Sequence, residues 1–341
     1  MTRRGPQRDS RPSPARTSAR LFDRVDIALR ARRTLLGSRD TNALRLFNGQ
    51  PDGIDGLVIE KYGNVLVAQW HQGRLSLSET EVRAVCEHVM RRAGAVAVYK
   101  KVFARDRNRP TASAVESHRD AQPWIGKPVE PRIAILENGM QLWIRAYDGL
   151  ATGLYLDQRD NRRLVREWAN GRRVLNTFSY TCAFSVAAAL GSAAETVSVD
   201  VSKKHLEWGK ENFAANQIPL EGHHFVCGDT LDYLRRARRQ GRRFDLIILD
   251  PPSFARTKRP AKVFALREVL PALIAEAAER LERGGRLLIS TNHRGISADQ
   301  LTRTVERVMR KHDATVKARA ALPTDFSGDA DYAKTVVVRM N

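Results

Sequence analysis

Residues 173–292 alternate apolar runs with helix-like stretches, and this alternation strongly limits the possible folds. Its apolar runs are "RVLNTF", "TVSVDVS", "HHFVCGD", "FDLIILD" and "GRLLISTN". Strands that alternate with helices form a parallel sheet covered on both faces, and such sheets bind ligands at the carboxyl ends of their strands. The sequence therefore predicts a doubly wound, Rossmann-like α/β domain, which we place at residues 131–341.

The part of the chain before this domain has a different pattern. Residues 1–20 contain many Arg, Pro and Ser residues and few apolar ones, which predicts a disordered basic tail. Residues 21–130 predict a small α+β domain, with two strands around a Tyr62-Gly63-Asn64 turn, a helix opened by Ser78 and a strand at "AVAVYKK". A polar excursion is predicted at residues 104–123.

The start of the larger domain predicts two further elements. In "AILENGMQLWI", Asn138-Gly139 supplies the two positive-φ positions of a tight turn, which predicts a hairpin. "TGLYLDQRDNRRLVREWANG" predicts a short strand that leads into a helix ended by Gly171.

Charge and cysteine content narrow the functional class. The formal net charge is +20 and comes mostly from Arg, which favours a polyanionic partner, RNA or DNA. The sequence has neither a membrane-spanning run nor a secretory signal, so we expect a cytoplasmic protein. Its three cysteines are far apart and form no C-x-x-C pair, which predicts free thiols and no metal.

The first strand ends in "NTFSYTCAF", a turn without glycine. Dinucleotides and P-loop ligands need glycines there, because their phosphates lie against bare backbone amides, whereas S-adenosylmethionine carries adenosine without phosphate. Asp200 and Asp229 end the next two strands, where they could accept from the ribose hydroxyls and the adenine amino group. Either residue could instead cap the following helix. Their register with Asp250 favours the cofactor site.

The stretch "DLIILDPPSFARTKRP" joins a strand to a basic loop. Pro251 and Pro252 cannot donate to a sheet, so they end the strand and leave acceptors near the Asp250 carboxylate. Phe254 offers a face on which a base could stack. We expect the following loop, with Arg256, Lys258 and Arg259, to close over an RNA backbone. The Arg-rich residues 235–243 fit either a solvated helix face or an RNA contact.

Several motifs in order carry a family resemblance. "NTFSYTCAFSVAAALG", "TVSVDVSKKHLEWGKENFAANQ", "FDLIILDPPSF", "GLYLDQRDNRRLV" and "RLFNGQPDGIDGLVIEKYG" together resemble the class I S-adenosylmethionine-dependent methyltransferases of 23S ribosomal RNA, over residues 44–341. The resemblance implies an RNA-facing small domain before the catalytic sheet. Some members carry a further N-terminal PUA module, for which we expect no space before Leu44.

The same resemblance implies a cofactor site around Asp157 and in the turn after the first strand. The implied cofactor contacts are Asn176, Phe178, Tyr180, Thr181, Phe184, Asp200, Asp229, Gln158 and Arg159. The sequence departs from the family at Cys182 and Ala183, where relatives usually have paired glycines. If the turn needs positive φ, Cys182 would be strained.

The family contains cytosine-C5 and guanine-N7 enzymes, which differ in the nucleophile they need. Cytosine C5 is methylated after a Cys thiolate adds to C6. Cytosine-type relatives carry that Cys after the fifth strand, where this chain has "ISTNHRG". "STNHRG" resembles the guanine-type sequence, and guanine N7 attacks directly through its lone pair. We therefore predict guanine N7, with Asp250, Pro251, Pro252 and Phe254 at the base and Arg294 on the RNA.

Two alternatives stay open from the sequence. One is a cytosine-C5 methyltransferase, and the other is a non-catalytic RNA-binding factor for ribosome assembly, which the basic composition fits equally well. The histidines have no metal-ligand spacing, and we expect His205, His223 and His224 to be surface or structural residues and His293 to be a loop residue.

Overall fold

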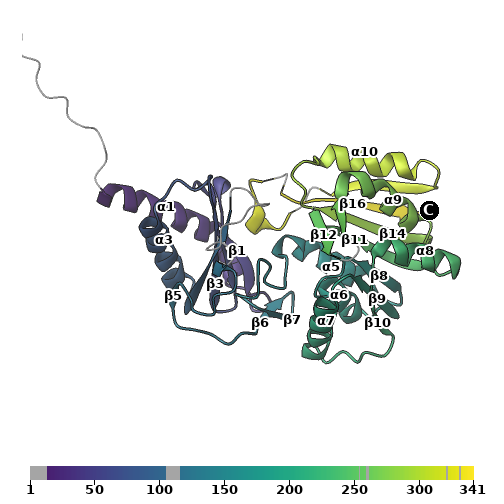
Figure 1. Ribbon diagram of the computed structural model, residues 1–341, viewed down its shortest axis with the longest axis horizontal. Helices are drawn as coiled ribbons and strands as arrows, with labels where there is room; N and C mark the ends of the chain where they lie inside the picture. The colour runs from purple at the N-terminus through teal and green to yellow at the C-terminus, as the bar shows by residue number, and fades with distance from the viewer. Residues whose placement is uncertain (1–13, 105–115, 253, 259–260, 320–321, 330–331) are drawn as a thin grey trace, which may run out of the picture.

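The computed structural model describes residues 14–104, 116–252, 254–258, 261–319, 322–329 and 332–341. Predictions for residues 1–13, for Arg259 and for most of the polar excursion at 104–123 lie outside these residues. The described chain forms a small N-terminal domain beside a larger α/β domain (Figure 1). None of its described helices is long and apolar enough to cross a membrane.

The small domain is a sheet of consecutive strands with helices on one face (Figure 1). Its strands are β1 (Ala43–Asn48), β2 (Leu57–Tyr62), β3 (Val65–His71), β4 (Ala97–Phe103) and β5 (Ile125–Gly126), and its short helices are α2 (Arg33–Leu36) and η1 (Gln50–Asp52). Helices α1 (Pro14–Ala31) and α3 (Glu79–Arg92) bury their apolar sides against this sheet. Ser78 opens α3, as the sequence predicts, and caps it in a full capping box.

Helix α1 corrects the expectation for residues 1–20. The helix begins at Pro14, so residues 14–20 are helical and belong with the small domain. Proline suits the first position of a helix because its φ is already helical and its missing N–H has no partner there. The apolar residues that anchor α1, Leu21, Val25, Ala28 and Leu29, follow only later in the sequence, which explains why composition alone missed the start.

A hairpin lies between the two domains. Strands β6 (Ile133–Glu137) and β7 (Met140–Ile144) pair through Asn138 (φ 49°) and Gly139 (φ 76°), which confirms the predicted turn. One apolar cluster joins residues of the small sheet, the hairpin and the larger domain, including Tyr62, Ile135 and Phe213. The two domains therefore share a continuous core.

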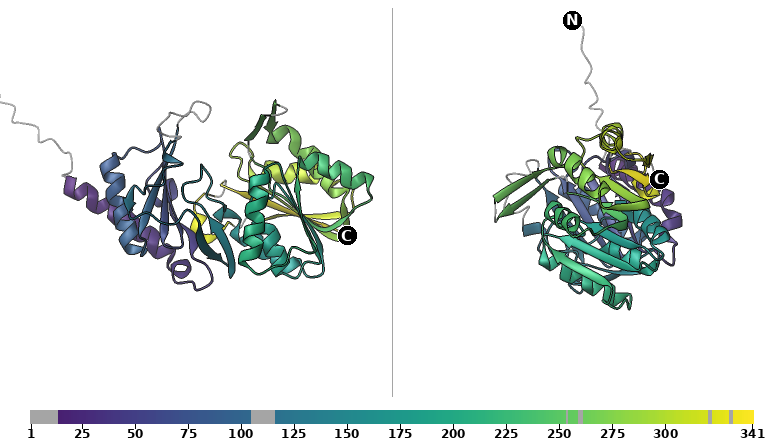
Figure 2. Two further views of the ribbon diagram at one scale, coloured as in Figure 1. Left: turned by 60° about the horizontal axis from the view of Figure 1, so that its bottom comes forward. Right: turned by 90° about the vertical axis from the view of Figure 1, so that its right-hand side faces the viewer.

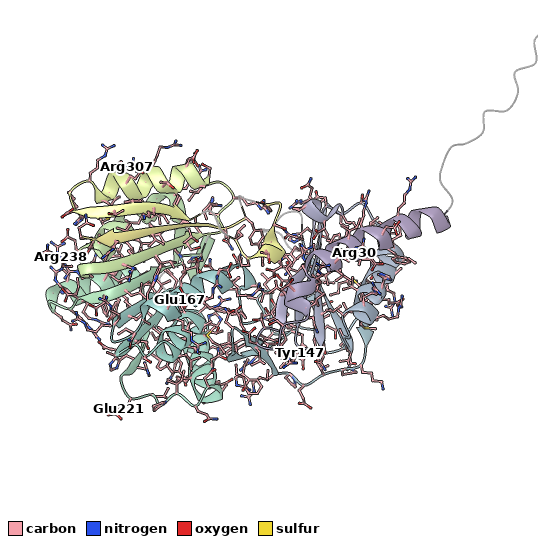
Figure 3. The ribbon with its side chains drawn as sticks, turned by 180° about the vertical axis from the view of Figure 1, so that it is seen from behind. Arg30, Tyr147, Glu167, Glu221, Arg238 and Arg307 are labelled. Carbon is pink, nitrogen blue, oxygen red and sulfur yellow. The ribbon has the colours of Figure 1, made fainter. Side chains whose placement is uncertain are left out.

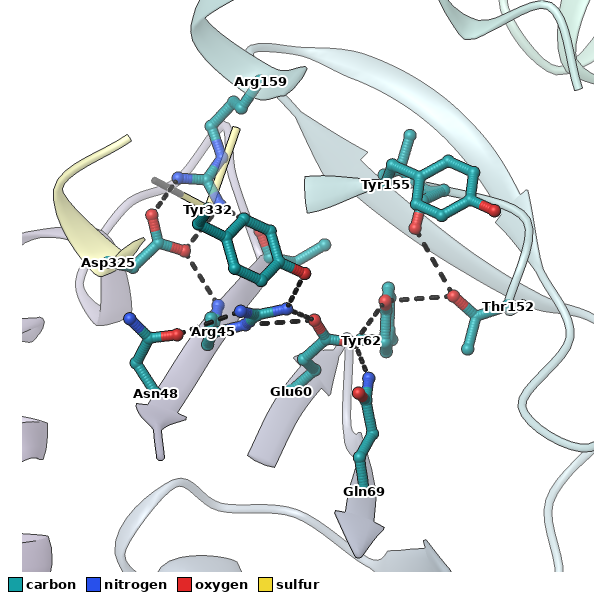
Figure 4. A network of polar contacts seen from close by, with 12 residues as sticks. Arg45, Asn48, Glu60, Tyr62, Gln69, Thr152, Tyr155, Arg159, Asp325 and Tyr332 are labelled. Carbon is teal, nitrogen blue, oxygen red and sulfur yellow. Dashed lines mark hydrogen bonds and ion pairs between the residues drawn. The ribbon is translucent and has the colours of Figure 1, made fainter. Parts of the chain in front are cut away.

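A buried polar network reinforces this junction (Figure 4). Arg45 of β1 donates to Glu60 Oε1 at 2.7 Å and to the Tyr332 hydroxyl at 2.9 Å. The Asp325 carboxylate accepts from the Arg45 backbone N–H and from the Arg159 guanidinium. Because buried charges require paired partners, the network fixes how the domains meet.

The larger domain contains a seven-stranded sheet in the order β10-β9-β8-β11-β14-β16-β15. Its strands are β8 (Arg173–Thr177), β9 (Glu195–Asp200), β10 (His223–Cys227), β11 (Phe244–Leu249), β14 (Leu281–Thr291), β15 (Ala314–Arg319) and β16 (Lys334–Met340). Only β16 runs antiparallel to its neighbours in this sheet. The doubly wound α/β fold is confirmed, while β15 was not predicted.

Helices cover both faces of the sheet (Figure 1). They are α5 (Arg159–Trp168), α6 (Ala183–Leu190), α7 (Lys203–Ala215), α8 (Thr230–Arg239), α9 (Leu266–Ala278) and α10 (Ala298–Met309), with the short helices η2 (Leu156–Gln158) and η3 (Thr324–Phe326). Leu246 and Ile248 of β11 pack toward α5 and α6, while Ile247 and Leu249 pack toward α8, α9 and α10. This alternation follows from the two-residue period of a strand.

Two local predictions were wrong. The segment before α5 is irregular and ends in η2 instead of forming a strand, because Thr152, Leu154 and Leu156 are buried at the domain junction and not in a sheet. The basic segment after Pro252 is a hairpin of β12 (Phe254–Lys258) and β13 (Ala261–Ala265), where a loop was expected. Antiparallel pairing satisfies the backbone groups of a segment that projects from the domain (Figure 2).

Candidate cofactor and base site

A cavity of about 830 Å³ opens at the carboxyl ends of β8, β9 and β11. The strand order reverses between β8 and β11, and parallel sheets bind ligands at this switch point. The predicted residues that line the cavity are Gln158, Phe178, Tyr180, Thr181, Phe184, Asp200, Asp229, Asp250, Pro251 and Pro252.

The turn between β8 and α6 is built from non-glycine residues with positive φ. Phe178, Tyr180 and Cys182 have φ of 51°, 49° and 61°. Left-handed geometry costs an ordinary residue about 1 kcal/mol, so the strain expected at Cys182 is present. Hydrogen bonds hold the turn: Ser179 N donates to Val199 O, and Tyr180 N donates to Asp200 Oδ2, both at 2.9 Å.

Asp200 and Asp229 combine structural contacts with cavity positions. Asp200 Oδ1 accepts from Ser202 N at 2.8 Å, in addition to the bond from Tyr180. Asp229 Oδ1 caps α8 by accepting from Leu231 N and Asp232 N. The alternative that Asp229 caps the following helix is therefore confirmed for one of its two carboxylate oxygens. Both carboxyl groups also line the cavity, so capping and ligand binding are compatible here.

At the other end of the cavity, Gln158 connects β11 to β14. Its Nε2 donates to Ser290 Oγ at 2.7 Å and lies 3.4 Å from Asp250 Oδ1. Asn161 Nδ2 donates to Gln158 Oε1 at 2.7 Å, which fixes the orientation of the amide. Because Gln158 is buried and held by Ser290 and Asn161, its amide can hold the Asp250 carboxyl group in a fixed orientation.

Two carboxyl groups in this region have raised pKa values. Burial raises the pKa of Asp250 to about 7; the nearby Asp157 carboxylate also raises it, and Arg162 lowers it. Burial raises the pKa of Asp157 to about 6, against the lowering effect of Arg45 and Arg162. Two acids in one cavity favour a cationic ligand or several N–H donors. A sulfonium cofactor that carries adenosine fits this set of acceptors.

Two predicted cofactor residues point elsewhere, which corrects their assignment. The Arg159 guanidinium donates to both Asp325 oxygens at 2.8 and 2.9 Å and to Ala43 O, at the domain junction. Asn176 is buried in β8, and its Nδ2 donates to Ser185 Oγ of α6 at 2.9 Å. Neither residue lines the cavity. The Arg159 side chain points from the start of α5 toward the domain junction, and the Asn176 side chain points toward α6.

The predicted base-stacking residue Phe254 and the predicted RNA-contacting residues follow Pro252 and Asn292 in the chain, both of which line the cavity. Phe254, Arg256 and Lys258 belong to β12, of which the structure describes the backbone. Arg294 follows β14 and forms an ion pair with Asp329 at 2.6 Å. In the same loop, His293 Nδ1 accepts from Gly295 N, which fits the loop role expected for this histidine.

Several cavity residues were missed or assigned otherwise. Arg162, Trp208 and Asn292 line the cavity without a motif that marks them. His205 was expected to be a surface or structural residue, yet it lines the cavity and makes an edge contact with the Tyr180 ring, whose centroid lies 4.6 Å away. Within the described residues no group of three His, Cys, Asp or Glu side chains could hold a metal ion.

Comparisons with known proteins give a consistent result. Residues 61–336 match the model of a family described as S-adenosylmethionine-dependent methyltransferase. YwbD of Bacillus subtilis, provisionally named a ribosomal RNA large subunit methyltransferase, is 34% identical over 92% of this chain and 78% of its own. Ribosomal RNA large subunit methyltransferase I of Yersinia pestis is 39% identical over 66% of this chain and 55% of its own.

Among solved structures, SMU.776, provisionally assigned as a methyltransferase and solved with SAH, aligns with a TM-score of 0.82 and 30% identity. The alignment covers 95% of this chain and 82% of SMU.776.

Proposed function

We propose that this chain, which belongs to the S-adenosylmethionine-dependent methyltransferase family, methylates guanine N7 in large-subunit ribosomal RNA. S-Adenosylmethionine supplies an electrophilic methyl group on a positively charged sulfur. The rRNA substrate is supported by the names of the relatives and by the net charge of +20. An rRNA substrate also agrees with the cytoplasmic location predicted from the sequence.

The observation that carries the choice of guanine is the position of the three thiols. Cys86 is buried in α3 of the small domain and Cys182 beneath the β8–α6 turn, and burial raises the pKa of each thiol to about 12. Cys227 is exposed at the end of β10, and two strands separate β10 from β11. Cytosine-C5 methylation needs a thiolate beside the base, and none of these positions supplies one.

Guanine N7 requires positioning more than acid–base chemistry. Its in-plane lone pair forms the new N–C bond as the methyl–sulfur bond breaks, and the base loses no proton, so the product ring carries a positive charge. Asp250 can accept from the N1–H and amino group of guanine when ionised. The Asp157 and Asp250 carboxylates also favour the cationic product over the neutral base.

Covalent trapping separates this proposal from the cytosine alternative. RNA that contains 5-fluorocytidine traps an enzyme that adds a thiolate to C6, because the fluorine cannot leave as a proton does. We expect no covalent adduct with the wild-type chain, and unchanged methyl transfer in a Cys227→Ser variant. A stable protein–RNA adduct that disappears when one cysteine is replaced would support cytosine C5 instead.

A further inference from the structure

A second cavity, of about 560 Å³, lies between α9 and α10. Arg267 of α9 and Arg303, Arg307 and Arg310 from α10 and its end line it, with a single carboxylate, Glu306. Its floor is apolar, from Leu270, Pro271 and Ile296. We call this cavity, with these lining residues, the arginine groove.

The arginines of this groove face solvent. All four are exposed, and within the described residues none forms an ion pair. Most arginines at the domain junction, by contrast, are buried and paired with Glu or Asp. Four exposed cations with a single carboxylate among them create a positive potential that attracts a polyanion.

The groove begins beside the proposed base site. The loop after β14 separates the two cavities: Asn292 lines the cofactor cavity and Ile296 lines the groove. Arg267 packs against this loop, since a Cβ added at Gly295 would lie 3.1 Å from Arg267 Nη2. A strand of RNA leaving the base site over this loop therefore meets Arg267 first.

The groove then follows α10 away from the small domain, and Figure 3 labels Arg307 on this helix. Arg303, Arg307 and Arg310 recur every three or four residues, so they form one stripe along the helix, beside the buried stripe of Leu301, Val305 and Met309. Successive turns are about 5.4 Å apart, which gives a row of guanidinium groups along one direction.

We propose that the arginine groove binds the RNA backbone next to the methylated nucleotide. This inference rests on the proposed rRNA substrate and adds a path for it, along α10 of the larger domain. Guanidinium groups bind phosphate oxygens through paired N–H donors, and their contacts carry no base specificity. The groove thus supplies affinity and register, while the cofactor cavity selects the base.

The test uses the full chain and the large-subunit rRNA fragment that the wild type methylates. Arg303→Gln/Arg307→Gln removes two charges at i,i+4 spacing from α10, and Arg235→Gln/Arg239→Gln removes the same charge at the same spacing from α8. We expect the α10 pair to bind the fragment about tenfold more weakly. The slope of log affinity against log salt should be shallower by about 1.4, at about 0.7 for each of the two lost contacts.

Arg235 is already paired with Asp232 on the exposed face of α8, so we expect this helix to be solvated and the α8 pair to stay within about threefold of the wild type. Both pairs should keep wild-type affinity for S-adenosylmethionine. Equal RNA affinity of the wild type and the α10 pair, or an equal loss of RNA affinity in the α10 and α8 pairs, would contradict RNA binding by the arginine groove. The proposed function would still be supported in that case, as long as the wild type methylates the fragment. If the wild type methylates no rRNA, the proposed function itself fails.

Discussion

Lys101 Nζ lies 2.7 Å from the carbonyl oxygen of Gly149, and it also donates to Leu150 O at 3.2 Å. Lys101 belongs to β4 of the small domain, whereas Leu150 lines the cofactor cavity. The side chain is almost fully buried, and burial lowers its pKa to about 8. The small domain therefore holds one wall of the cofactor cavity in place.

Replacing this amine should weaken cofactor binding. In Lys101→Met the two loop carbonyls lose their donor, at a cost of about 1.4 kcal/mol, so we expect a tenfold higher Kd for S-adenosylmethionine by calorimetry. Lys100→Met is the matched control, since Lys100 is paired with Glu79. Identical cofactor affinities in the two variants would show that Lys101 has no role in the cavity.

The raised pKa of Asp250 predicts a pH-dependent reaction. Below about pH 7 the carboxyl group is protonated and cannot accept from two guanine N–H groups, so kcat/KM should rise with pH across the pKa of about 7. Asp250→Ala should abolish turnover and leave cofactor affinity unchanged. Parallel loss of turnover and cofactor affinity would place Asp250 in the cofactor site.

The raised pKa of Asp157 predicts that this residue lowers the stability of the cofactor-free protein in a pH-dependent way. Its folded-state pKa is raised to about 6. The buried carboxylate therefore lowers the stability of the folded protein above about pH 6, whereas the protonated acid that is present below pH 4 does not lower it. Asp157→Asn should therefore stabilise the cofactor-free protein by about 3 kcal/mol at pH 8 and by little at pH 4. Denaturant unfolding at both pH values measures this, and an equal gain at both would contradict it.

Cys182 and Gly209 are complementary in size. A Cβ at Gly209 would lie 2.4 Å from Cys182 Sγ, so Gly209→Ala should destabilise the protein by about 2 kcal/mol. Cys182→Gly/Gly209→Ala should recover most of that loss, because glycine removes the sulfur and tolerates the positive φ of this position. Additive destabilisation in the double variant, seen by thermal unfolding, would contradict the contact.

Sequence reasoning worked best where local pattern decides the structure. The strand that ends at Asp200 and the strand that ends just before Asp250 follow from apolar runs and from proline chemistry, so their carboxyl ends were placed correctly. Arg159 was misplaced because its role depends on Asp325, which is 166 residues away in the chain. The role of Lys101 likewise arises only where distant segments meet, because its partner Gly149 is 48 residues away in the chain.

The identity of the methylated nucleoside tests the central claim most directly. Large-subunit rRNA is incubated with the wild-type chain and isotopically labelled S-adenosylmethionine, digested, and analysed by nucleoside mass spectrometry. A guanine-N7 methyltransferase yields label in 7-methylguanosine, and the Asp250→Ala variant yields none. Label in 5-methylcytidine, or no label in rRNA, would contradict the proposed function.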